Sequence, residues 1–208
     1  MTQIKTHINH FPGIRSFETE ESHLFFGREN QIEDIVSVLT DTHFLAMIGS
    51  SGTGKSSLIR AGVIPTVLKS EVNNQRDWDL TVFKPADNPI LSFAEYTKTF
   101  NRKAVAKGIA ITTEAEVELA LRTGQDAILN AHNLLGSDPW LIVIDQFEEI
   151  FRYQKAVHPE EEKNESIHFI NLFLDMLNRN KLNAPIFVIL TMRSDFLDHC
   201  TEISGLTE

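Results

Sequence analysis

A glycine-rich stretch between an apolar run and a helical pattern carries the residue types that bind phosphate. It fits G-x-x-x-x-G-K-[ST] at every fixed position and consists of Gly49, Ser50, Ser51, Gly52, Thr53, Gly54, Lys55 and Ser56. Glycines let backbone N–H groups turn inward, and these groups bind anions together with the positive end of the following helix. We expect Lys55 to reach the β- and γ-phosphates of a nucleotide and Ser56 to hold Mg²⁺. Ser57 completes the expected binding set.

A second polar signature follows the apolar run at 140–144. Asp145 comes directly after this run, where a carboxylate can hold Mg²⁺ beside a phosphate loop. Glu148 and Glu149 follow three and four residues later, and either could orient or deprotonate an attacking water. The spacing does not choose between them, although we slightly favour Glu149. Acidic residues are also favoured at the start of a solvated helix, so a structural role stays open for both.

A third signature follows the apolar run at 186–190. Arg193 lies just beyond this run and could sense the γ-phosphate or stabilise charge during its transfer. An ion pair with the nearby Asp195 is the structural alternative, and the sequence supports both equally.

These signatures, with two further segments, resemble the STAND class of P-loop NTPases and in particular its novel-STAND bacterial subgroup. The matching segments are 11–17 (FPGIRSF), 24–29 (LFFGRE), 49–65, 144–151 (IDQFEEIF) and 190–196 (LTMRSDF). The resemblance implies an additional-strand fold, in which a strand lies between the phosphate-loop strand and the acidic strand. It also implies that Gly27 and Arg28 lie near adenine as cofactor-binding residues and that Arg193 occupies the sensor position.

The resemblance further implies a domain organisation and a function. We expect an irregular N-terminal segment, 1–25, to pack on a nucleotide-binding domain, 26–208, that lacks the family's usual C-terminal lid and winged helix. The implied ligands are ATP or ADP with Mg²⁺, and the implied activity is slow hydrolysis in a signalling switch that controls assembly with protein partners or further copies. Two alternatives stay open: a small-molecule or nucleotide kinase, and a nucleotide-binding module without useful catalysis.

Helical and strand patterns alternate along the chain and must position these residues. Apolar runs predict strands at 44–48, 80–83, 140–144 and 186–190, and helical spacing predicts helices at 29–39, 56–69, 89–107, 114–132 and 167–177. Thr113 and Glu116 form a capping-box pattern before the helix at 114–132. Residues 157–166 are a charged loop or a helix start, and Phe25 and Phe26 are expected in the core. The alternation indicates an α/β fold, a three-layer P-loop NTPase with a mostly parallel central sheet.

Composition excludes several classes of protein. The chain has 208 residues and a net charge of −10, which argues against direct nucleic-acid binding because such binding needs surplus Lys and Arg. A single cysteine excludes an internal disulfide framework, and no apolar run approaches the ~20 residues of a membrane span. We therefore expect a cytoplasmic protein that does not bind membranes.

Overall fold

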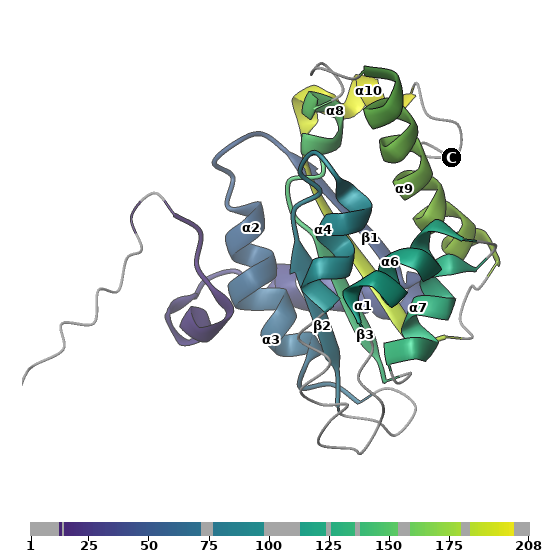
Figure 1. The fold of residues 1–208 in the computed structure, drawn as a ribbon. Helices are drawn as coiled ribbons and strands as arrows, with labels where there is room; N and C mark the ends of the chain where they lie inside the picture. Colours follow the sequence, from purple (N-terminus) through teal and green to yellow (C-terminus); the bar gives the residue numbers. More distant parts are fainter. Residues whose placement is uncertain are drawn as a thin grey trace, which may run out of the picture.

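Four parallel strands form the central sheet of the protein (Figure 1). The computed structural model describes residue 13 and residues 15–71, 77–97, 113–123, 126–135, 138–153, 159–179 and 184–201. The strands are β1 (Phe44–Gly49), β2 (Asp79–Phe83), β3 (Trp140–Ile144) and β4 (Ile186–Arg193), in the order β1-β4-β3-β2. Because β4 lies between β1 and β3, the predicted additional-strand arrangement is confirmed.

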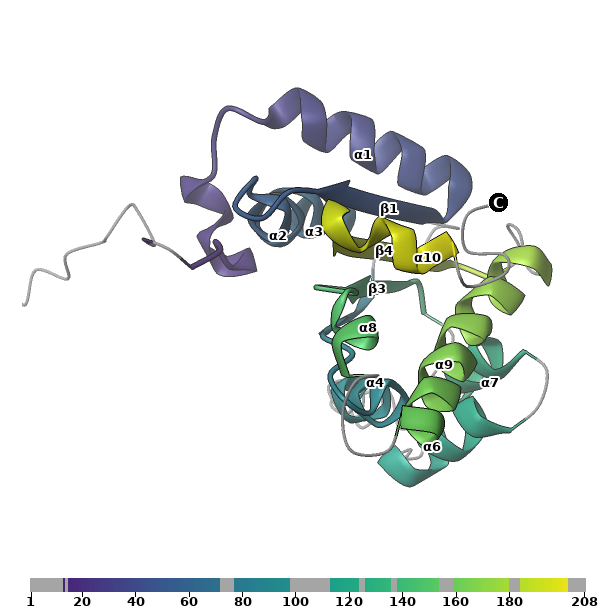
Figure 2. The same ribbon diagram turned by 90° about the horizontal axis from the view of Figure 1, so that it is seen from above.

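Alternate residues of the two central strands enter two separate hydrophobic cores. Ile142 and Val188 belong to the larger core, whereas Leu141 and Ile189 belong to the smaller one. This division follows from the period of two in a strand, which sends successive side chains to opposite faces. Figure 2 shows α1 (Glu29–Thr42) on one side of the sheet and α4 (Pro89–Tyr96), α6 (Glu114–Arg122), α7 (Ala127–Leu135) and α9 (Pro159–Arg179) on the opposite side. The predicted three layers are therefore present.

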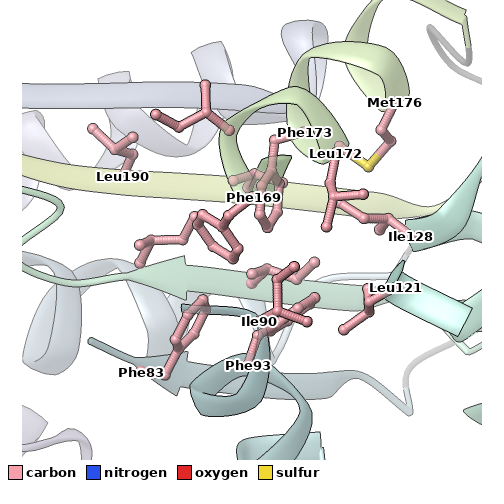
Figure 3. Packing of buried hydrophobic residues seen from close by; sticks show 14 of the residues in the cluster. Phe83, Ile90, Phe93, Leu121, Ile128, Phe169, Leu172, Phe173, Met176 and Leu190 are labelled. Carbon is pink, nitrogen blue, oxygen red and sulfur yellow. The ribbon is translucent and has the colours of Figure 1, made fainter. Parts of the chain in front are cut away.

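Aromatic rings fill the larger core, where α4 and α9 cover the sheet (Figure 3). The Phe93 ring stacks on Trp140 at a centroid distance of 5.5 Å and on Phe83 at 5.1 Å. Phe169 and Phe173 meet it from α9 at 6.5 and 5.8 Å. Burying several large rings holds the helices on this face and thereby fixes the strand ends that carry the polar signatures.

The helix after the phosphate loop runs continuously through three segments. These are α2 (Lys55–Ser57), the π-helix η2 (Leu58–Val63) and α3 (Ile64–Val67), which begin one residue before the predicted helix 56–69 and end two residues short of it. Pro65 has no N–H to donate, and the wider π turn accommodates such a break in the hydrogen-bond ladder. A Cβ at Gly62 would lie 2.6 Å from Ile32 Cδ1, so any larger residue would force the Ile32 side chain of α1 to shift.

One of the predicted helices is divided in the structure. The prediction of a single helix at 114–132 is wrong, because α6 ends at Arg122 and a second helix, α7, begins at Ala127. Thr123 is extended and Asp126 has a φ of +63°, neither of which continues a helix. The predicted capping box is present, with the Thr113 hydroxyl accepting from the Glu116 N–H at 3.2 Å.

Other segments refine or correct the expectation. The charged stretch 157–166 includes a helix start, since α9 begins at Pro159. The segment 1–25, expected to be irregular, includes a 3₁₀ helix, η1 (Thr19–Leu24). Part of the helix predicted at 89–107 lies outside the described residues.

Two burial predictions near β1 are wrong. Phe26 is 75% exposed, not part of a core. The apolar run of β1 also indicated a strand buried on both faces, but β1 is only partly buried, because it borders the described sheet and pairs with β4 alone. A short α8 (Glu149–Tyr153), a 3₁₀ turn η4 (Ser194–Phe196) and α10 (Leu197–Thr201) complete the described elements.

Candidate functional site

The phosphate loop joins the end of β1 to the start of α2. Gly52 and Gly54 have φ values of +79° and +81°, the left-handed region that side chains with a Cβ rarely adopt. The Lys55 amine donates to the carbonyl oxygens of Gly49 at 2.6 Å and Ser50 at 2.9 Å. Ser50 O also accepts from the Thr53 hydroxyl at 3.0 Å. Lys55 therefore lies across the loop, with its charge beside the loop backbone.

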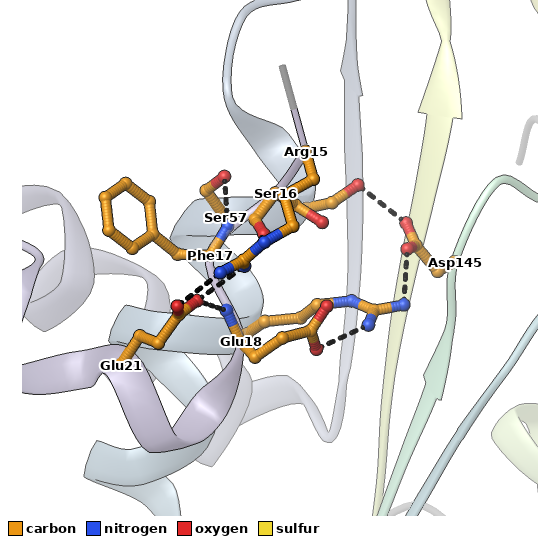
Figure 4. A network of polar contacts seen from close by, with 9 residues as sticks. Arg15, Ser16, Phe17, Glu18, Glu21, Ser57 and Asp145 are labelled. Atoms are coloured by element: carbon orange, nitrogen blue, oxygen red, sulfur yellow. Dashed lines mark hydrogen bonds and ion pairs between the residues drawn. The ribbon is translucent and has the colours of Figure 1, made fainter. Parts of the chain in front are cut away.

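Three elements converge on Asp145 at the end of β3, and Figure 4 shows part of this network. Asp145 Oδ1 accepts from the Ser56 hydroxyl of α2 at 2.9 Å and from the Thr191 hydroxyl of β4 at 2.7 Å. Its Oδ2 accepts from an Arg60 N–H of η2 at 3.1 Å. The Asp145 side chain is only 4% exposed, so these contacts replace nearly all of its hydration. The structure thus brings together Ser56 and Asp145, the two residues expected to hold Mg²⁺.

Arg60 connects this cluster to the N-terminal segment. It also donates to Glu18 Oε2 at 2.8 Å, so one guanidinium bridges two carboxylates. Burial lowers the pKa of Arg60, but the hydrogen bond that Arg60 donates to Glu18 and the charge of Asp145 outweigh burial and leave that pKa above its usual value. The guanidinium stays charged and offsets the negative charge of the buried Asp145.

The turn after β3 separates the two candidate glutamates. Gln146 has a φ of +57° and donates its N–H to the Thr191 hydroxyl at 3.0 Å, which anchors the turn to β4. Glu148 is buried and its Oε2 accepts from the Arg193 N–H at 3.2 Å. Glu149 begins α8, is partly exposed and does not line the cavity beside the phosphate loop. The fold brings Glu148, not the slightly favoured Glu149, to this cavity.

Arg193 forms the ion pair with Asp195 that was its structural alternative, and it also lines the cavity. Its guanidinium pairs with Asp195 at 3.1 and 2.5 Å, and this contact lowers the pKa of the Asp195 carboxyl. The same side chain lies over the Phe196 ring at 5.7 Å and lines the cavity. The pair is largely exposed, so water screens it and an anion in the cavity can compete with Asp195.

A cavity of about 620 Å³ joins these groups. It is lined by residues 51–57 of the loop and helix start, by Glu148 and by Arg193. Arg15 of the N-terminal segment and Arg152 of α8 also line it. Among its described lining residues, four carry positive charge and only Glu148 carries negative charge. A chain of net charge −10 thus concentrates positive charge in this hollow, which suits a polyphosphate.

A second hollow of about 410 Å³ shares Thr53 and Lys55 with the first. Arg28 lines it together with apolar side chains that include Ile35 and Ile48, and an Arg28 N–H lies 3.4 Å from Thr53 O. Gly49 also lines this hollow. Gly27, with a φ of +84°, lines neither hollow and donates its N–H to Glu29 Oε1 at 2.9 Å. Of the two residues expected near adenine, only Arg28 lines a hollow.

The donor atoms near Asp145 fit a hard cation. The Ser56 hydroxyl and the Asp145 carboxylate supply oxygen donors, the type that Mg²⁺ prefers in company with phosphate oxygens and water. Within the described ranges, no cluster of three or more His, Cys, Asp or Glu side chains forms a protein-only metal site. The residues therefore suit a metal that is shared with a bound phosphate.

Sequence reasoning missed several residues of the site. Arg60 lies four residues after Ser56, and this helical spacing places both on one face, so the signal was present. Arg15 belongs to the segment FPGIRSF, which contributed to the family resemblance, but no role was assigned to Arg15 from the sequence. Thr191 likewise belongs to a segment of the resemblance, LTMRSDF, whereas Arg152 had no local signal, because only the tertiary fold brings it to the cavity.

An all-parallel sheet with an additional strand, a phosphate loop and an acidic strand end defines the P-loop NTPase class. The chain belongs to the Novel STAND NTPase 1 family, whose sequence model matches residues 11–208. The fold is similar to that of the Walker-type ATPase PABY2304 of Pyrococcus abyssi, with a TM-score of 0.50 and 12% identity. The match covers 86% of this chain and 47% of that protein, so the chain spans about half its length. No curated protein matches the chain in sequence.

In the part of the chain that the structure describes, none of the helices combines the length and apolar character needed to cross a bilayer.

Proposed function

We propose that this chain binds ATP with Mg²⁺ at the larger cavity and acts as a nucleotide-dependent switch with slow ATP hydrolysis. The observation that carries the proposal is the convergence of the phosphate loop, Lys55 and Ser56 on one positively charged hollow, with the buried Asp145 hydrogen-bonded to Ser56. The proposed arrangement places the triphosphate against residues 49–57 and the base toward the hollow beside Arg28. It also treats residues 26–208 as the nucleotide-binding domain, with the segment 1–25 packed against it.

Each proposed role follows from the position of a side chain. Lys55 would leave the carbonyl oxygens of its own loop and bind phosphate, and Ser56 and Asp145 would hold Mg²⁺, which neutralises phosphate charge when bound. Glu148 would accept a proton from the attacking water, because it is the cavity's one described carboxylate. Arg193 would exchange Asp195 for the γ-phosphate. With ATP bound, Arg193 at the end of β4 would then pair with phosphate, and with ADP bound it would pair with Asp195.

Nucleotide binding is tested by calorimetric titration of ATP and Mg²⁺ into the wild-type chain and a Lys55→Ala variant. We expect ATP to bind to the wild-type chain and not to the variant, since Lys55 is the only lysine that lines the cavity among the described residues. Lys69→Ala is the matched control, because Lys69 is exposed and outside the cavity. Equal affinity of Lys55→Ala and wild type would contradict the proposal.

Hydrolysis is tested by single-turnover phosphate release from bound ATP. Glu148→Gln keeps the shape of the side chain but removes the base, so we expect ATP binding without phosphate release. Glu149→Gln is the control and should release phosphate at the wild-type rate. Binding with no phosphate release from the wild type would instead favour a nucleotide-binding module without catalysis.

A further inference from the structure

The N-terminal segment reaches the phosphate loop through contacts that fix its position (Figure 4). The Phe17 N–H donates to the Ser57 hydroxyl at 3.1 Å, and Glu18 pairs with Arg60 at 2.8 Å. The Phe17 ring also contacts the Phe25 ring at 5.7 Å. These contacts hold the segment against the helix that begins with Lys55 and place the preceding residue pair, Arg15 and Ser16, in the cavity wall.

Arg15 carries a positive charge that the phosphate-loop motif does not include. Its side chain lines the cavity and forms a two-pronged ion pair with Glu21, with N–O distances of 2.7 and 2.5 Å. The pair is exposed, with 52% of the Arg15 side chain accessible, so its net stabilisation is small. A phosphate group offers the same paired oxygens as a carboxylate, with greater negative charge, and can replace Glu21 as the partner of the guanidinium.

We propose that Arg15 binds a phosphate group of the nucleotide. Before the nucleotide binds, Glu21 holds the Arg15 guanidinium in position, and it then competes with the phosphate for that guanidinium. This inference rests on the proposed function of the cavity. The N-terminal segment would thereby supply a phosphate ligand from within the same chain, in addition to those of the phosphate loop. A role confined to holding the segment in place makes the opposite prediction for Glu21, because both halves of a structural ion pair are then equally necessary.

The test is calorimetric titration of ATP with Mg²⁺ into wild type and the variants Arg15→Gln, Glu21→Gln and Lys55→Ala. Arg15→Gln should weaken ATP binding by about tenfold, the effect of one charged hydrogen-bonded contact. Glu21→Gln should bind ATP at least as tightly as wild type, because the competitor is gone. Arg122→Gln is the matched control, since Arg122 forms a similar two-pronged pair with Glu165 and lies outside the cavity.

The outcomes separate this inference from the proposed function. A loss of less than about threefold in Arg15→Gln, with binding abolished in Lys55→Ala, would overturn the role of Arg15 and leave the nucleotide site standing. An equal loss in Arg15→Gln and Glu21→Gln would also overturn it, in favour of a structural pair. Absence of binding to the wild type would overturn both. Urea unfolding of each variant shows that all four chains are folded under the conditions of titration.

Discussion

Breaking the ion pair between Arg60 and Asp145 should destabilise the fold measurably, because one partner is almost fully buried. The Asp145 side chain is 4% exposed, whereas that of Arg60 is 22% exposed. Breaking a fully buried pair costs about 3–5 kcal/mol, since a charge is left without a partner. The partial exposure of Arg60 lets water reach the vacated oxygen, and the Ser56 and Thr191 hydroxyls still donate to the other. We therefore expect Arg60→Met to cost about 2–3 kcal/mol.

A double-mutant cycle isolates the pairwise interaction. Asp145→Asn removes the charge and keeps an acceptor for the two hydroxyls, so we expect a cost of about 1–2 kcal/mol. The double variant should cost less than the sum of the single variants by about 1–2 kcal/mol, because Arg60→Met no longer leaves a buried charge unpaired.

The assay is urea unfolding followed by far-UV circular dichroism at pH 7, with EDTA and without nucleotide. With a slope of about 2–3 kcal/mol per molar urea, Arg60→Met should lower the midpoint by about 1 M. Glu18→Gln is the matched control, because it removes only the exposed partner of the same guanidinium and should cost less than about 1 kcal/mol. Equal costs for Arg60→Met and Glu18→Gln, or strict additivity in the cycle, would refute the reasoning.

Two further predictions concern local structure and pH. Thr113→Ala removes one half of the capping box of α6 and should cost about 1 kcal/mol, measured by urea unfolding; an unchanged midpoint would contradict the hydrogen-bond assignment. His132 is buried against Trp140, and burial lowers its pKa below the ordinary value of 6.5, so the folded chain keeps it neutral while the unfolded chain takes up a proton. Stability should therefore fall as pH drops through 6.5, and His132→Asn should reduce this dependence between pH 8 and pH 5.5; an equal dependence in both chains would refute it.

The sequence alone determined those features that depend on neighbouring residues. The phosphate loop is defined by glycines, a lysine and a serine at fixed spacing, and the strand before it and the helix after it follow from local periodicity. The capping box at Thr113 is local in the same way. The position of Asp145 after an apolar run also required no knowledge of distant residues. The resemblance to STAND proteins added the strand between the phosphate-loop and acidic strands, and the observed order of the sheet confirms it.

Which side chains share the site depends on packing between distant parts of the chain. Arg60 meets Asp145 across 85 residues and Ser56 meets it across 89, so their contact depends on how the helix crosses the sheet. Glu148 and Glu149 are neighbours in sequence, but the turn at Gln146 buries the first and leaves the second at the start of α8. Arg15 entered the cavity wall because Phe17 and Glu18 attach their segment to the phosphate-loop helix. Local spacing fixes local conformation, whereas a shared cavity depends on packing between elements far apart in the chain.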